Sequence, residues 1–234
     1  MATLKNGERR MMSDLKIGDS ILAVDHLGNF IFSPIILFLQ KDPEILAQFY
    51  NVQTESGQSL EISRSHLVYI RPQNRDKNKL VTNQSESFFV TNNEKLEVAV
   101  ADQLGSFSLM FASSVKVGDE LLVHNGNDEL ALTKVKSVKP TIVNGAYAPL
   151  TLQGNLVVND IASSCYASYD SHNIVHALFA PFRWWHEVSK YLPHMFVGTH
   201  DEEMKEAEGI HWYARALKSM GKYLDMIPSQ PSME

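Results

Sequence analysis

Hydrophobic positions between Met1 and about Tyr169 fall in short runs that are typical of β-strands. Gly, Asn, Asp and Ser separate the runs, as they do in all-β domains with tight turns. The polar segment from Arg71 to Asn93 is predicted to be a long loop or a small insertion. The first 170 residues are therefore predicted to form a β domain whose strands include Ile21–Val24, Ile35–Phe38, Leu60–Ile70, Leu121–Val123 and Leu156–Val158.

The β pattern occurs twice. LKIGDSILAV, at Leu15–Val24, recurs as VKVGDELLVH at Val115–His124, an offset of 100 residues. Both copies hold a Lys-[Ile/Val]-Gly-Asp turn, in which Gly can take a positive φ, before an apolar strand. A looser match aligns Gly57 with Gly154. The two matches predict β subdomains that arose by duplication and pack about a pseudo-twofold axis.

Helical spacing replaces the strand pattern after residue 170. In the segment APFRWWHEVSKYL, Pro181 stands near the expected helix start, and apolar residues follow at helical intervals. A second amphipathic stripe consists of Tyr213, Leu217, Met220, Leu224 and Ile227. We therefore divide the chain into a β domain at residues 1–170 and a helical region at residues 171–234.

Composition narrows the classes of partner. The chain is 44% hydrophobic and 21% charged, as globular proteins are, and its net charge of −6 comes without a basic tract. We therefore expect no nucleic-acid partner. The N-terminus has no apolar core of the kind a signal peptide needs, and no uncharged stretch is predicted to span a membrane. His172 and His176 have the spacing of zinc ligands, but the metalloprotease Glu is missing, so we expect no metal.

Three residues could carry chemistry. His66 titrates near neutrality and can donate or accept a proton, and Ser63, three residues earlier, could polarise a carbonyl group. The alternative is a turn serine beside a structural histidine. Cys165 is the single cysteine, which excludes a disulfide within the chain. The Gly57–Gly154 alignment brings Cys165 near the equivalent of His66, so the two could face one shared site.

Six blocks follow one another in an informative order: LKNGERRMMSDLKIGDSILAV, FSPIILFLQKD, LEISRSHLVYI, YAPLTLQGNLVVNDIASSCYA, HALFAPFR and GIHWYARAL. The most specific are SSCYA, then APFR, then HWY. Together they resemble the C-terminal autoprocessing region of hedgehog proteins along nearly the whole chain. The resemblance implies a mainly β hedgehog/intein (Hint) fold with duplicated subdomains, followed by a sterol-recognition region of amphipathic helices.

That family implies a self-cleaving transferase. A cysteine that opens the region attacks the preceding peptide bond and forms a thioester by N-to-S acyl shift, and cholesterol then displaces the thioester as a co-substrate, without a cofactor. The resemblance implies that His66 protonates the departing amide nitrogen. It also implies that Ser63, where the family usually has Thr, polarises the scissile amide. Cys165 matches the family's second cysteine, which lies near the active site and influences thiol exchange.

Two positions depart from the family pattern. The nucleophilic cysteine would stand a few residues before Ala2, upstream of Met1, so we expect this chain to be a fragment that is inactive as given; an alternative start or an engineered truncation also fits. Gln40 stands where the family has the Asp that serves the sterol hydroxyl. Gln cannot take up a proton at neutral pH. Asp42 could replace it only if the loop shifted.

The resemblance also implies partners and location. The partners are a covalently attached N-terminal signalling domain and cholesterol. The precursor is expected in the endoplasmic reticulum and the extracellular space. In the secretory pathway Asn83 would be a glycosylation acceptor. Aromatic residues of the tail are either packing residues or a surface for sterol or a membrane: Phe182, Trp185, Trp212 and Tyr213.

Two other functions remain open from the sequence. One is a non-catalytic, degenerate Hint scaffold that binds sterol or a membrane surface. The other is a hydrolase with a dyad of Cys165 and His66, which would require a lowered pKa of the thiol.

Overall fold

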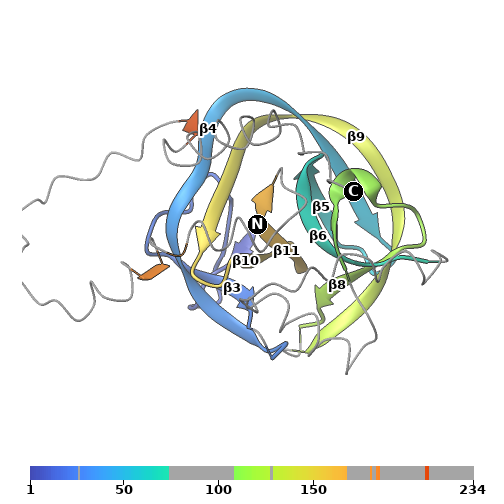
Figure 1. Cartoon of the computed structure of the whole chain (residues 1–234), viewed down its shortest axis with the longest axis horizontal. Coiled ribbons are helices and arrows are strands. Elements are labelled where there is room, and N and C mark those ends of the chain that lie inside the picture. Colours follow the sequence, from blue (N-terminus) through green and yellow to red (C-terminus); the bar gives the residue numbers. More distant parts are fainter. Residues whose placement is uncertain are drawn as a thin grey trace, which may run out of the picture.

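The computed structural model describes residues 1–25, 27–73, 108–126, 129–167, 180, 183–184 and 209–210. These residues form a 12-stranded sheet that curls on itself (Figure 1). The elements are β1 (Ala2–Thr3), β2 (Arg9–Arg10), β3 (Ser20–Val24), β4 (Phe30–Thr54), β5 (Ser59–Ser63), β6 (His66–Arg71), β7 (Ser108–Phe111), the 3₁₀ helix η2 (Ala112–Ser114), β8 (Glu120–His124), β9 (Leu130–Thr151), β10 (Asn155–Val158), β11 (Ile161–Ala167) and β12 (Gly209–Ile210).

Strands β4 and β9 are the two longest strands of the described sheet. They pair antiparallel along most of their length and curve as two long arcs around the shorter strands (Figure 1). β4 also pairs with β3 near its start and with β5 near its end, and β9 pairs with β8. The β4–β9 ribbon therefore joins two groups of strands.

The expectation of short strands was wrong in two places. The run Ile35–Phe38 is part of β4, which continues past Pro43. Pro43 lies where the register shifts between Asp42 and Leu46, so its missing N–H interrupts no regular ladder. The run Leu60–Ile70 consists of two strands, β5 and β6, because the chain turns between them at residues 64–65.

Equivalent hydrogen bonds confirm the duplication. The N–H of Gly18 donates to the carbonyl oxygen of Ile35 at 2.8 Å, and that of Gly118 donates to Val135 at 2.9 Å. The two glycines have φ values of 92° and 91°, which L-residues with a side chain rarely adopt. The offset of 100 residues is therefore a repeated local structure as well as a repeated sequence.

The second, looser match is also confirmed. The hydroxyl of Thr54 donates to the carbonyl oxygen of Gln58 at 3.3 Å, and the hydroxyl of Thr151 donates to that of Asn155 at 2.7 Å. In each turn the glycine between them, Gly57 or Gly154, donates its N–H to the Thr carbonyl.

The hydrophobic core of the described residues consists of three clusters, and each of them draws residues from both halves of the chain. One cluster of buried residues includes Leu15, Ile21 and Ile35, and a second includes their equivalents Val115, Leu121 and Val135. A third cluster contains both Leu22 and Leu122, and so is built from both repeats. Equivalent residues of the two repeats therefore lie in separate clusters in the first two cases and share the third.

Little of the predicted helical region lies in the described residues. Ala180 and residues 183–184 are helical, and β12 pairs with β4. The other predicted helical residues, and with them the division at residue 170, remain untested predictions. In the part of the chain that the structure describes, no helix has the length and apolar character needed to cross a membrane.

Candidate functional site

The stretch SRSH forms the turn that leads from β5 into β6. β5 pairs with β4, whereas β6 pairs with β7, β8 and β11, so the turn carries the chain from one part of the sheet to another. Ser63 ends β5 and His66 begins β6. The turn brings the Ser63 Oγ to 3.0 Å from Nδ1 of His66, a hydrogen bond whose donor depends on the histidine tautomer. The two side chains are therefore a bonded pair.

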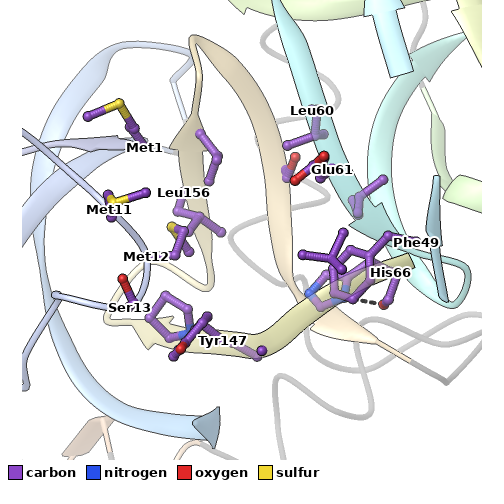
Figure 2. Close-up of a pocket in the computed structure, with 18 of the residues that line it drawn as sticks. Met1, Met11, Met12, Ser13, Phe49, Leu60, Glu61, His66, Tyr147 and Leu156 are labelled. Atoms are coloured by element: carbon purple, nitrogen blue, oxygen red, sulfur yellow. Dashed lines mark hydrogen bonds between the residues drawn. The ribbon is translucent and has the colours of Figure 1, made fainter. Parts of the chain in front are cut away.

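This pair opens on a cavity of about 370 Å³ that also reaches Cys165 and the N-terminal residue. Figure 2 shows Met1, Met11 and Ser13 on one side, with Phe49 and His66 on the opposite side. The dashed line at His66 is its bond to the serine hydroxyl. The structure thus brings three sequence-predicted site residues, Ser63, His66 and Cys165, to one cavity, between the two repeats.

Burial lowers the pKa of His66 to about 4, because the cavity wall gives the charged imidazolium little solvation. The ring is therefore neutral at pH 7 and has one nitrogen that accepts and one that donates. An imidazolium formed briefly in this place would be a stronger acid than a solvated one. The His66 side chain is therefore better suited to transferring a proton than to remaining protonated.

Cys165 is a buried, protonated thiol. Its exposed fraction is 1%, its Sγ lies 3.6 Å from Oγ1 of Thr151, and burial raises its pKa to about 11. A nucleophilic cysteine needs the opposite shift, toward a thiolate at neutral pH. These observations oppose a hydrolase with Cys165 as its nucleophile.

The next residue, Tyr166, ties the tail segment to the β domain. Nη1 of Arg183 donates a hydrogen bond to the Tyr166 hydroxyl at 3.0 Å. Burial raises the pKa of Tyr166, whereas the Arg183 charge opposes that rise. Tyr166 belongs to the SSCYA block and Arg183 to APFR, so two of the most specific blocks meet beside Cys165.

Gln40 lies on β4, outside the set of residues that line the cavity. It is half-buried and pairs with Ala148 of β9 and with Ile210 of β12. Ala148 itself lines the cavity, so Gln40 is close to the cavity through its strand partner. Oδ1 of Asp42 accepts the backbone N–H groups of Glu44 and Ile45 at 3.1 and 3.2 Å, so this carboxylate is bonded to its own strand.

The remaining predicted site residues lie outside the described residues: Phe182, Trp185, Trp212, Tyr213, Asn83, His172 and His176. Among the residues that are described, no group of three or more His, Cys, Asp or Glu is arranged to hold a metal ion.

Sequence reasoning missed Ser163, which lines the cavity two residues before Cys165. The repeat contained the signal. Extending the Gly57–Gly154 alignment without a gap, at an offset of 97 residues (154 − 57), sets Ser163 against His66 in the sequence (66 + 97). The apolar wall formed by Met11 and Met12 was also missed, because neither stands in a recognisable pattern.

Comparisons with known proteins show the family of the chain. Residues 1–226 match the family model described as the Hint module. The chain is 32% identical over 224 residues to the Tiggy-winkle hedgehog protein of Danio rerio, covering 95% of this chain and 46% of that protein. It is 28% identical over 225 residues to the Sonic hedgehog protein of Danio rerio, covering 96% and 48%. The chain therefore spans about half the length of these curated relatives.

Among solved structures, a DnaB intein from Synechocystis sp. PCC 6803 matches 72% of this chain and 94% of its own, with a TM-score of 0.48 and 13% identity. The family model covers the two repeats, the cavity between them and most of the tail. The chain belongs to the Hint module family.

Proposed function

We propose that this chain is an autoprocessing domain of a hedgehog-type precursor. It cleaves the peptide bond of a polypeptide joined to its N-terminal side and passes the acyl group to a sterol. The observation that carries the proposal is the bonded pair of Ser63 and His66 at the cavity that also holds Met1. A polypeptide joined to Met1 would begin at the wall of this cavity, across from the pair.

In the first step, a cysteine in that preceding segment supplies the nucleophile. Its sulfur bonds to the carbonyl carbon of the residue before it, the carbon–nitrogen bond breaks, and the thiol proton ends on the released amine. Neutral His66 suits the transfer of this proton, because its low pKa makes the imidazolium form a strong acid toward the amide nitrogen. The Ser63 hydroxyl orients the imidazole and can donate to the scissile carbonyl.

In the second step, a sterol hydroxyl attacks the thioester carbonyl, the carbon–sulfur bond breaks, and the hydroxyl proton passes to the thiolate. Gln40 can hydrogen-bond the incoming hydroxyl but cannot take up its proton. It pairs with Ile210, the second residue of the GIHWY block, in β12. We therefore expect this step to be slower than the first.

The relatives extend the proposal to partners. Hedgehog precursors place a signalling domain before the Hint module, and that domain would be the acyl donor here. The precursor would pass through the endoplasmic reticulum and act in signalling between cells outside the cell. The tail, with its aromatic residues, would meet cholesterol or a membrane surface.

A second candidate is a Hint scaffold that binds sterol without chemistry. Gln40 in place of a carboxylate favours it, because a binding module needs no general base.

The experiment that separates the two is a fusion. A reporter is joined through a Gly-Cys-Phe junction and a short linker to Ala2, and cleavage is followed on a gel with dithiothreitol alone and with cholesterol alone. We expect cleavage with dithiothreitol and none in a control with the junction Cys replaced by Ala. A folded fusion that is cleaved in neither lane would favour the binding module.

A further inference from the structure

Ser163 carries a buried hydroxyl that the folded protein does not use. Its exposed fraction is 3%, and within the described residues its Oγ has no hydrogen-bond partner. Both polar neighbours are in use: the Ser164 hydroxyl accepts the Tyr166 N–H at 3.1 Å, and Cys165 contacts Thr151. Ser163 therefore differs from the two polar residues that follow it.

An unpartnered buried hydroxyl is costly, because it loses its water without gaining a protein partner. Alanine would fill the same place in the strand without that penalty. Ser163 lines the cavity together with Ser63 and His66. A bound molecule with a hydrogen-bond acceptor would supply the bond that the Ser163 hydroxyl lacks. Binding that molecule would then be the function of this serine.

The strand geometry places Ser163 at an interruption of the sheet. Ser163 of β11 is opposite Val68 of β6, and the register then shifts before Ala167, which is opposite His66. A shift of this kind leaves residues outside the regular ladder and turns side chains toward nearby sites. Ser163 from the second half of the chain and His66 from the first half line the same cavity.

We propose that Ser163 binds the peptide segment that is cleaved: its Oγ–H donates a hydrogen bond to a backbone carbonyl oxygen of the polypeptide joined to Met1. This inference rests on the proposed autoprocessing function and adds a substrate-binding residue from the second repeat. A peptide is the better-matched occupant, because it offers carbonyl acceptors along its length, whereas a sterol has a single hydroxyl. Ser163 takes no part in bond making; it fixes the position of the segment that Ser63 and His66 act on.

The test uses the Gly-Cys-Phe fusion with Ser163→Ala, Ser163→Thr and, as a matched control, Ser164→Ala. Removing an unused hydroxyl should leave the melting temperature unchanged or raise it by up to about 4 °C. Removing the Ser164 hydroxyl should lower it, because the Tyr166 N–H then loses its acceptor. The rate of cleavage at saturating dithiothreitol, which reports the acyl shift, should fall by roughly 3- to 10-fold in Ser163→Ala. Thr, which keeps a hydroxyl, should restore it.

Several results would overturn the inference. An unchanged cleavage rate in Ser163→Ala would mean that the hydroxyl meets only water. A melting temperature that falls as far as in Ser164→Ala would mean a structural role. A loss confined to cholesterol-dependent cleavage would assign the hydroxyl to the sterol. If the unmodified fusion fails to cleave, the proposed function fails, and that result is separate from any effect of Ser163.

Discussion

His66 is opposite Ala167 in the sheet, not opposite Cys165. Antiparallel pairs keep the sum of their residue numbers constant, and the pair of Val68 with Ser163 gives 231, which would set His66 opposite Cys165. The register shift in β11 moves the pairing by two residues. His66 and Cys165 therefore share a cavity without being partners in the ladder, and the thiol faces Thr151 instead.

The first prediction concerns His66. In the Gly-Cys-Phe fusion, His66→Ala should slow cleavage with dithiothreitol by at least about 100-fold, since a positioned proton carrier is lost. The matched control is His124→Ala, which removes a histidine that packs edge-on against Phe30 at 4.6 Å. His124→Ala should keep most of the cleavage rate. Equal rates in the two variants would contradict the role assigned to His66.

The second prediction concerns Gln40. Gln40→Asp introduces a group that can take up a proton from the sterol hydroxyl. We expect cholesterol-dependent cleavage to rise by about 100-fold or more, while cleavage with dithiothreitol stays the same. Gln40→Asn, which has a shorter amide, is the control and should give no gain. No gain with Asp either would show that position 40 does not limit the sterol step in this protein.

The third prediction is a pH dependence of stability. His66 has a pKa of about 4 in the folded protein and near 6.5 when unfolded, so between these values the unfolded chain binds more protons. The free energy of unfolding should therefore fall as the pH drops from about 6.5 to about 4. Urea unfolding at pH 7 and pH 4.5 measures the effect. His66→Gln, which cannot be protonated, should lose less stability over the same range; an identical loss would place the acid sensitivity elsewhere.

The fourth prediction concerns the reactivity of the thiol. The pKa of Cys165 is about 11, and its side chain is buried, so little thiolate is available near neutrality. Iodoacetamide at pH 7.5 should label the folded chain at least about 100-fold more slowly than the chain in denaturant. Comparable labelling rates at pH 7.5 would reveal an activated thiol and bring back the dyad of Cys165 and His66.

The fifth prediction compares equivalent turns of the two repeats. Asp119 is 3% exposed, and its carboxylate accepts the N–H groups of Lys116 and Gln73 at 2.8 and 3.1 Å. Asp19 accepts the Lys16 N–H at 2.8 Å in a more exposed place. Asp119→Ala should lower the free energy of unfolding by about 2–3 kcal/mol and Asp19→Ala by about 1 kcal/mol, measured by urea titration. Equal losses would mean that the Gln73 contact contributes no more than the ion pair of Asp19 with Arg10 at 3.0 Å.

The sequence predicted the parts of the fold that depend on the conformational preferences of single residues. The Gly-Asp turns and the matching glycines Gly57 and Gly154 could be found because each turn needs a particular residue at a particular place, and their repetition indicated the duplication. The length of β4 could not be found in this way. Half-exposed strands carry polar residues, and Pro43 is accommodated by a register shift that depends on the partner strand β9.

The candidate site could likewise be predicted from the sequence only in part. Ser63 and His66 were found because they lie three residues apart and meet within one turn. The alignment of the repeats points to position 163, but that Ser163 lines the cavity with an unpartnered hydroxyl depends on the packing of β11 within the described residues. The high pKa of Cys165 also could not be predicted, because it depends on burial by residues distant in the chain.

The division of the cavity between the repeats has a consequence for timing during synthesis. Ser63 and His66 are made early, whereas Ser163 and Cys165 follow about a hundred residues later, and the two sets meet only once β11 pairs with β6. Chemistry that needs both sets cannot begin on a nascent or half-folded chain. A precursor would therefore be cut only after its processing domain has folded completely.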